Sequence, residues 1–438
     1  MTGDRPTVYV RMADAGDLYS TWRWAGESAP GGVGVVPEEQ VEAAMRRFAA
    51  ALPAPGKPGG LESALTAGEL ASYESENALA QYLSATFLPY NLAVVLHELY
   101  VQGVRPHIRI QPSPRTAQLP WELIAPDADV RLVEIADVSV LAAPGVVHAP
   151  ARVARSWAET HERPVVAILD PRVPGFRADS ALGSVLGRMD SAAPLAERVA
   201  AHAGAGRLVP AVGDAVEAFR RTDLDRAWLS RALHAGAARL LYVGHVTAAA
   251  PESGRSESAT LHLSCTAASP GCAPAYRDHR PLSARDLLLG THAVPSGHAH
   301  LGDAGNGQGG NGIPRTGPEI WPIPSRVALI ACESGGDLRF AEPLGLVAAM
   351  LTGGAELVTA GRWPLPTDLA FLRLAGTPVT ARPFQEAVCA IDAAHESEDP
   401  VVALNAWQRT HLAAWRETGA IEHSPLIWAA FATVDTRP

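Results

Sequence analysis

A histidine and a cysteine follow two apolar runs, at points where a buried strand would end. The run "LLYVGH" ends on His245, and the run "VALIAC" ends on Cys332. A thiol becomes a nucleophile when a base assists the loss of its proton, and histidine is the usual base. Because the carboxyl ends of neighbouring parallel strands meet at one edge of a sheet, the two side chains are expected there together. An imidazolium beside the thiol would then lower the pKa of Cys332.

Spacing alone leaves simpler interpretations of this pair open. A cysteine after an apolar run is often a small buried hydrophobe, and a histidine at a strand end is often a hydrogen-bonded surface residue. The neighbouring residues Gly244, Gly335 and Gly336 favour the chemical interpretation, because glycine lets a substrate backbone approach closely. The pair therefore predicts a thiol-based active site at the edge of a sheet.

Apolar runs alternate with helical patterns from Arg163 to the end of the chain. The runs "RPVVAILD", "ARLLYVGHV", "SRVALIACES" and "ELVTAGRW" are short and continuous, which is typical of strands covered on both faces. Helical patterns lie between them, including "EPLGLVAAMLTGGA" and the segments Pro383–Ala394 and Pro400–Thr418. This alternation predicts an α/β fold with a mainly parallel central sheet flanked by helices.

Composition excludes several classes of protein. The chain has 438 residues, of which 47% are hydrophobic, so it can bury a large core. A net charge of −10 argues against a nucleic-acid partner. No apolar run reaches the ~18 residues of a membrane helix, and the first residues lack the pattern of a signal peptide. We therefore expect a cytoplasmic protein that binds neither nucleic acid nor membrane.

Several segments resemble the CHAT family of bacterial caspase-like cysteine peptidases, which are related to separase. They are "LPWELI", "LLYVGHV", "ALIACESGG", "AEPLGLVAAMLTGGAELVTAGRWPLPTD" and "HSPLIWAAFATV". They occur in the order of the family and extend over roughly residues 105 to 436. The resemblance implies a CHAT domain over residues 105–438. Residues 1–104 lie outside it, and their role, either regulatory or docking, is not indicated by the sequence. A Gly- and Pro-rich insertion at 295–322 is expected to be flexible.

The resemblance implies a caspase-like three-layer sandwich with a Cys-His dyad. Cys332 matches the nucleophile, and His245 matches the residue that protonates the leaving amine and then activates water to hydrolyse the thioester. Backbone N–H groups of Gly244, Val246 and Glu333 would stabilise the oxyanion. Family members commonly have glycine after the histidine, so Val246 is expected to resist the backbone angles of that position.

Other side chains near the cysteine are candidates for substrate recognition. Asp337 and Glu342 could bind a basic substrate side chain, although Glu342 could simply open the helix that follows it. Trp363 could line the substrate pocket or pack in the core. Four further residues have side chains that can bind a metal: His262, Cys265, Cys272 and His279. Their spacing matches no common zinc site, and neither a metal nor a cofactor is expected.

These observations favour a caspase-like cysteine endopeptidase that cleaves a protein substrate, in keeping with the bacterial signalling and defence roles of the family. One alternative is a catalytically inactive module with the same fold, which binds a signalling partner. Another is a different thiol enzyme, such as an acyl transferase. The geometry of Cys332 and His245 discriminates between these interpretations.

Overall fold

The structure is a computed structural model that describes residues 5–26, 30–150, 152–291 and 315–437. Most of the insertion expected at 295–322 lies outside the described residues. Its described part includes the short helix α11 (Gly317–Ile320).

A mixed sheet of eleven strands forms the centre of the molecule. The strand pairs are parallel except β1–β2, β2–β3 and β13–β14, which confirms the predicted α/β class with a mainly parallel sheet. Across the sheet the order is β3 (Gly31–Val36), β2 (Asp17–Trp24), β1 (Thr7–Ala15), β4 (His107–Gln111), β5 (Asp137–Leu141), β14 (Phe431–Asp435), β13 (Leu357–Gly361), β12 (Arg326–Ile330), β8 (Arg239–Val243), β6 (Val165–Leu169) and β7 (Leu208–Val209).

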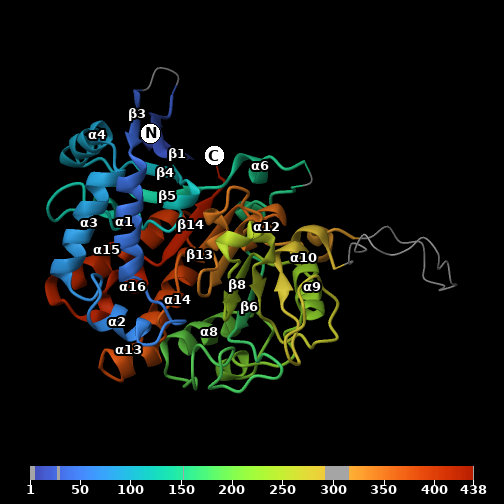
Figure 1. Cartoon of the computed structure of the whole chain (residues 1–438). Helices are drawn as coiled ribbons and strands as arrows, with labels where there is room; N and C mark the ends of the chain where they lie inside the picture. Colours follow the sequence, from blue (N-terminus) through green and yellow to red (C-terminus); the bar gives the residue numbers. More distant parts are fainter. Residues whose placement is uncertain (1–4, 27–29, 151, 292–314, 438) are drawn as a thin grey trace.

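Helices cover both faces of this sheet, as a three-layer arrangement requires (Figure 1). Alternate residues of the central strands belong to two separate hydrophobic cores: Leu241 and Ala328 to one, Leu240 and Val327 to the other. The first core is shared with α1 (Glu38–Ala51), α2 (Gly60–Thr66), α3 (Tyr73–Phe87), α4 (Tyr90–Val101), α5 (Leu132–Ile135), α8 (Pro194–Gly204), α13 (Asp368–Leu374), α14 (Pro383–Ala394), α15 (Pro400–Thr418) and α16 (Pro425–Trp428). The second core is shared with α6 (Pro144–Val147), α9 (Arg226–His234), α10 (Ala284–Leu289), α11 and α12 (Leu346–Thr352).

The N-terminal region is part of the same sheet. β1 pairs in parallel with β4, with Thr7 in register with His107, and the hairpin of β2 and β3 extends the sheet beyond it. Helix α3 also lies beside the C-terminal helix α15, where the Trp415 indole N–H donates to the Glu76 carboxylate (Figure 1). The division at residue 104 therefore falls between α4 and β4, within one continuous sheet. A regulatory or docking role for residues 1–104 stays a prediction.

Local sequence sets the limits of the predicted helices. Helix α15 begins after Asp399, whose Oδ1 accepts the Val401 N–H at 3.1 Å, and ends at Gly419 with φ +61°. The ranges expected for α14 and α15 are confirmed. Helix α12 is shorter than expected and begins at Leu346, because the Asp337 carboxylate accepts the Ala348 N–H and caps the helix there.

Two smaller features complete the description. A separate three-stranded sheet has the order β11 (Leu282–Ser283), β10 (Thr260–Leu261) and β9 (Val246–Thr247), and helix α7 (Trp157–Thr160) lies near the start of β12.

Within the described residues, no single helix has the length and apolar character to cross a membrane. Among the described helices, only the pair α3 and α4, counted together across a bend of 118°, reaches the length and apolar composition of a membrane span.

Candidate active site

His245 and Cys332 emerge at the same edge of the main sheet. β8 and β12 are neighbouring parallel strands, with Val243 in register with Ile330. His245 and Cys332 each follow one of these paired residues by two positions. The expectation that the two strands are neighbours is therefore confirmed. Both residues lie beyond the carboxyl ends of their strands, where open α/β sheets bind ligands.

One hydrogen bond fixes the tautomer of His245. Its Nε2 lies 3.0 Å from the carbonyl oxygen of Gly183, and a carbonyl oxygen can only accept, so Nε2 carries the proton. Burial lowers the pKa of His245, and the bond to Gly183 opposes this effect only in part. A neutral ring with the proton on Nε2 leaves Nδ1 as the nitrogen that can accept a proton.

A buried aspartate holds the loop that carries Gly183. Asp170 directly follows β6, and its Oδ1 accepts the Val185 N–H at 3.1 Å, while the Ser184 hydroxyl donates to Oδ2. Arg220 joins the two ends of this network, because it pairs with Asp170 and also donates to the Gly183 carbonyl at 3.1 Å. Asp170 is not among the residues predicted for the site, although it ends the run "RPVVAILD" at the same sheet edge.

The thiol of Cys332 is partly buried, and its surroundings favour the protonated form. Its sulfur accepts the Leu365 N–H at 3.4 Å, and within the described residues no hydrogen bond joins it to His245. Burial raises the pKa of Cys332, the Glu333 carboxylate raises it further, and the Leu365 N–H acts in the opposite direction. The expectation that an imidazolium lowers the pKa of Cys332 is therefore wrong for this arrangement: the pKa of Cys332 is raised, and burial lowers the pKa of His245.

Two of the three predicted oxyanion donors already have acceptors. The Gly244 N–H donates to the Ile330 carbonyl at 3.3 Å, within the ladder between β8 and β12. The Glu333 N–H donates to the Trp363 carbonyl, also at 3.3 Å. Both groups are therefore occupied by the protein's own backbone.

The register of β9 and β10 turns the third predicted donor outward. The His262 N–H donates to the His245 carbonyl at 3.1 Å, so these residues form a hydrogen-bonded pair. Val246 and Leu261 come next in register, at a non-hydrogen-bonded position, where the N–H points away from the partner strand. Since β9 is the edge of its small sheet, the Val246 N–H faces its open side.

Backbone strain lies at Glu333 and not at Val246. Val246 is part of a regular strand and is not among the residues with positive φ, so the expected conflict with its side chain is absent. Glu333 takes the left-handed conformation, with φ +48°, directly after Cys332. Its carboxylate pairs with Arg339 at 3.2 Å. Such a conformation in a residue other than glycine costs ~1–2 kcal/mol.

The three candidates for substrate recognition differ in exposure. Asp337 is 4% exposed and caps α12 through the Ala348 N–H at 3.0 Å, and burial raises its pKa to about 6. Trp363 is fully buried, and its indole N–H donates to the Leu426 carbonyl at 3.1 Å. Both side chains thus belong to the packed interior. Glu342 is exposed, but it precedes α12 and does not open it.

A cavity of about 660 Å³ lies beside His245, because its wall includes His262, whose backbone N–H donates to the His245 carbonyl. Its wall includes Thr247, two residues after the histidine, and Leu182, the residue before Gly183. No pattern in the sequence indicates this cavity, because its wall combines β9, β10 and a loop near residue 274, which are separate segments of the chain.

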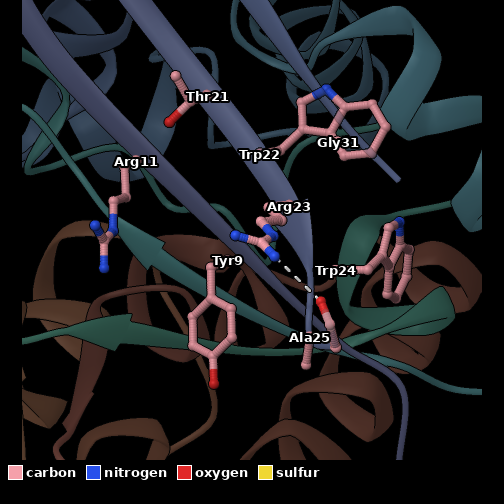
Figure 2. A pocket seen from close by; sticks show the side chains of 9 residues that line it. Tyr9, Arg11, Thr21, Trp22, Arg23, Trp24, Ala25 and Gly31 are labelled. Atoms are coloured by element: carbon pink, nitrogen blue, oxygen red, sulfur yellow. Dashed lines mark hydrogen bonds between the residues drawn. The ribbon is translucent and has the colours of Figure 1, made fainter. Parts of the chain in front are cut away.

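A second cavity, of about 730 Å³, lies on the N-terminal strands β1 and β2. Figure 2 shows Tyr9, Arg11 and Arg23 beside these strands, with Trp22 and Trp24 also in its wall. β1 is five positions from β12 in the sheet order, or about 24 Å at the usual strand spacing. This cavity is therefore separate from the edge that carries Cys332.

One group of side chains has the spacing of metal ligands. His202, Asp392 and Glu396 bring ligand atoms within 4.8 Å of one another. Arg198 and Arg239 each pair with both carboxylates, so their negative charge is already balanced. This cluster is better described as a buried ion-pair network than as a metal site.

Comparison with models of known protein families finds no match to this chain. Comparison with curated protein sequences finds no match either. The function is therefore inferred from the residues and geometry of the sheet edge, together with the resemblance of its motifs.

Proposed function

We propose that the protein is a caspase-like cysteine endopeptidase in which Cys332 is the nucleophile and His245 is the acid and base. One observation carries the proposal: β8 and β12 pair in parallel, so both residues emerge at one sheet edge. The bond from His245 to Gly183 adds to it, because it leaves Nδ1 able to accept a proton. The resemblance to CHAT peptidases gives the reaction class and a role in bacterial signalling or defence.

The reaction begins from a neutral pair. His245 Nδ1 takes the thiol proton as the Cys332 sulfur attacks the substrate carbonyl carbon. The oxyanion that forms is stabilised by the outward N–H of Val246, a contribution of ~3 kcal/mol for one such donor. His245 then gives its proton to the leaving amine, the C–N bond breaks, and a thioester remains on the cysteine.

Hydrolysis of the thioester completes the cycle. His245, neutral again, removes a proton from water as the water oxygen attacks the thioester carbon. The C–S bond breaks, His245 returns the proton to the thiolate, and the product leaves as a carboxylic acid that loses its remaining proton to solvent. If an amine replaced water as the attacking group, the same site would act as an acyl transferase.

A non-catalytic interaction module is the second candidate. It is favoured by the raised pKa of Cys332 and by the carbonyl partners of the Gly244 and Glu333 N–H groups. A peptide-library digest analysed by mass spectrometry distinguishes the two. An endopeptidase gives new termini that the Cys332→Ala variant does not produce, whereas a binding module gives none with either protein. A transferase gives products with the added mass of an amine.

A further inference from the structure

The cavity beside His245 has an apolar wall and a charged rim. Leu182, Ala273, Pro274 and Tyr276 contribute to the apolar part of the wall. At a volume of about 660 Å³, the cavity is within the range of small-molecule and side-chain binding sites. Because the cavity lies next to His245, the proposed acid and base, a substrate at this edge of the sheet would place part of its chain near the cavity.

The cavity flanks the histidine and not the cysteine. Leu182 precedes Gly183, whose carbonyl holds the His245 ring, and Thr247 follows His245 by two residues. Among the described residues, none in its wall lies between 325 and 365, the segment that contains Cys332 and the donor to its sulfur. Because His245 protonates the leaving amine, the substrate chain after the cleaved bond starts beside His245. That chain is the part of the substrate nearest to the cavity.

A chain of hydrogen bonds sets the direction of the Thr247 hydroxyl. His279 Nδ1 lies 2.8 Å from the Cys265 carbonyl and must donate to it, so the neutral His279 has Nε2 as an acceptor. That Nε2 lies 3.1 Å from His262 Nδ1, which therefore donates. His262 Nε2 is then left as an acceptor, and the Thr247 hydroxyl donates to it at 2.9 Å.

Burial favours the neutral form of both imidazoles in this chain of hydrogen bonds. It lowers the pKa of His262 to about 3 and also lowers the pKa of His279. With its proton directed inward to His262, the Thr247 hydroxyl can offer only lone pairs to the cavity. It therefore suits a ligand N–H and repels a carbonyl oxygen.

The rim of the cavity carries more positive than negative charge. Arg255 and Arg285 are exposed there, and Glu257 is the acidic residue of the wall. In the part of the chain that the structure describes, neither arginine takes part in an ion pair. A carboxylate on the ligand would therefore find an available partner without displacing an existing one.

We infer that this cavity binds the substrate on the leaving-group side of the cleaved bond. It selects a peptide segment that combines an apolar side chain with an adjacent acidic residue, and Thr247 accepts an N–H of its backbone. The inference rests on the proposed peptidase function. Thr247, Ala273 and Arg285 are specificity-determining residues in this account.

Cleavage of a peptide library with varied positions after the cut tests the inference. We expect the wild-type protein to prefer Leu over Gly by about tenfold or more, from burial of the side chain. Ala273→Trp, which fills the cavity, should reduce that preference to about twofold. Thr247→Val should raise KM about tenfold with little change in kcat, while Thr247→Ser should stay close to wild type. Thr21→Val, in the distant cavity, is the matched control and should have no effect.

Charge reversal gives a test that does not depend on filling the cavity. Arg285 is exposed, so Arg285→Glu should leave the fold intact. It should convert the preference of the cavity for Asp in the substrate into a preference for Lys. Cleavage with no preference after the cut, unchanged by these variants, would overturn the inference and leave the peptidase function standing.

A binding measurement distinguishes failure of the cavity assignment from failure of the proposed peptidase function. Fluorescent peptides carrying Leu-Asp or Gly-Lys are titrated against the Cys332→Ala protein. If no peptide is cleaved by the wild type, but Leu-Asp peptides bind and Ala273→Trp abolishes binding, the cavity is supported as a binding site and the peptidase function fails. Equal binding of both peptides, or binding of neither, overturns the cavity assignment.

Discussion

The Nε2 atom of His245 lies 3.0 Å from the carbonyl oxygen of Gly183, and this contact decides which ring nitrogen is free for proton transfer. The carbonyl is held by a loop that Asp170 and Arg220 organise from the end of β6. The orientation of the His245 ring thus depends on the Asp170 carboxylate. Among the hydrogen bonds of the described residues, none joins Asp170 directly to His245.

Asp170→Asn should lower kcat about tenfold to a hundredfold, because a small displacement of a catalytic group is costly. Asp170 raises the pKa of His245, so its loss should also move the acidic limb of the kcat/KM profile to lower pH. Steady-state kinetics between pH 5 and 8 measure both effects. Asp179→Asn, on the exposed part of the same loop, is the control. A normal kcat with an unshifted acidic limb would show that Asp170 does not position His245.

The rate at which Cys332 is alkylated should depend on pH as it does for an ordinary thiol, and not as it does for an activated thiolate. Its pKa is raised above the usual ~8.5, so the rate with iodoacetamide should rise about tenfold per pH unit from pH 6 to 8. Mass spectrometry of labelled peptides measures this rate, with Cys272, whose pKa is raised to about 11, as the internal reference. A plateau below pH 7 that His245→Ala removes would instead indicate a thiolate–imidazolium pair.

Val246→Pro removes the one predicted oxyanion donor that faces away from its partner strand. Because this N–H is not in the ladder, and β9 is an edge strand, the substitution should cost little stability. It should lower kcat about a hundredfold or more, while Val246→Ala keeps the N–H and most of the activity. Equal activity of the Pro and Ala variants would remove Val246 from the oxyanion site.

Glu333 combines a strained backbone with a charge beside the thiol, and two variants separate these effects. Both Glu333→Gly and Glu333→Gln lose the ion pair with Arg339, but only glycine relieves the φ of +48°. The Gly variant should therefore have a free energy of unfolding about 1 kcal/mol higher than the Gln variant. Both should lower the pKa of Cys332, since the carboxylate raises it. Equal stability in denaturant titrations would argue against stored strain.

The sequence predicted the elements whose pattern is local. The continuous apolar runs before His245 and Cys332 are β8 and β12, and the predicted limits of α14 and α15 are correct. Each of these helices has a proline at its first position, Pro383 and Pro400, which marks its start. The pattern does not show that Asp337 caps α12 from outside the helix, so the sequence predicts a start for this helix that is too early.

The details of the site depend on contacts between distant residues. Gly183 is 62 positions before His245, and Trp363 packs against the Phe48 ring while its indole N–H donates to the Leu426 carbonyl. The raised pKa of Cys332 likewise results from burial, which residue types alone do not encode. A short apolar run followed by a polar residue, as at Asp170, is the one sequence signal that could have added a residue to the predicted site.

The central claim is that Cys332 and His245 act as one catalytic unit. Its most direct test is the rate of peptide-bond cleavage by the wild-type protein, by Cys332→Ala, by His245→Ala and by the double variant, on a substrate found in the library digest. Each single variant should lose nearly all activity, and the double variant should be no worse than either, because nucleophile and base contribute to the same step. Cleavage that persists in Cys332→Ala would contradict the account.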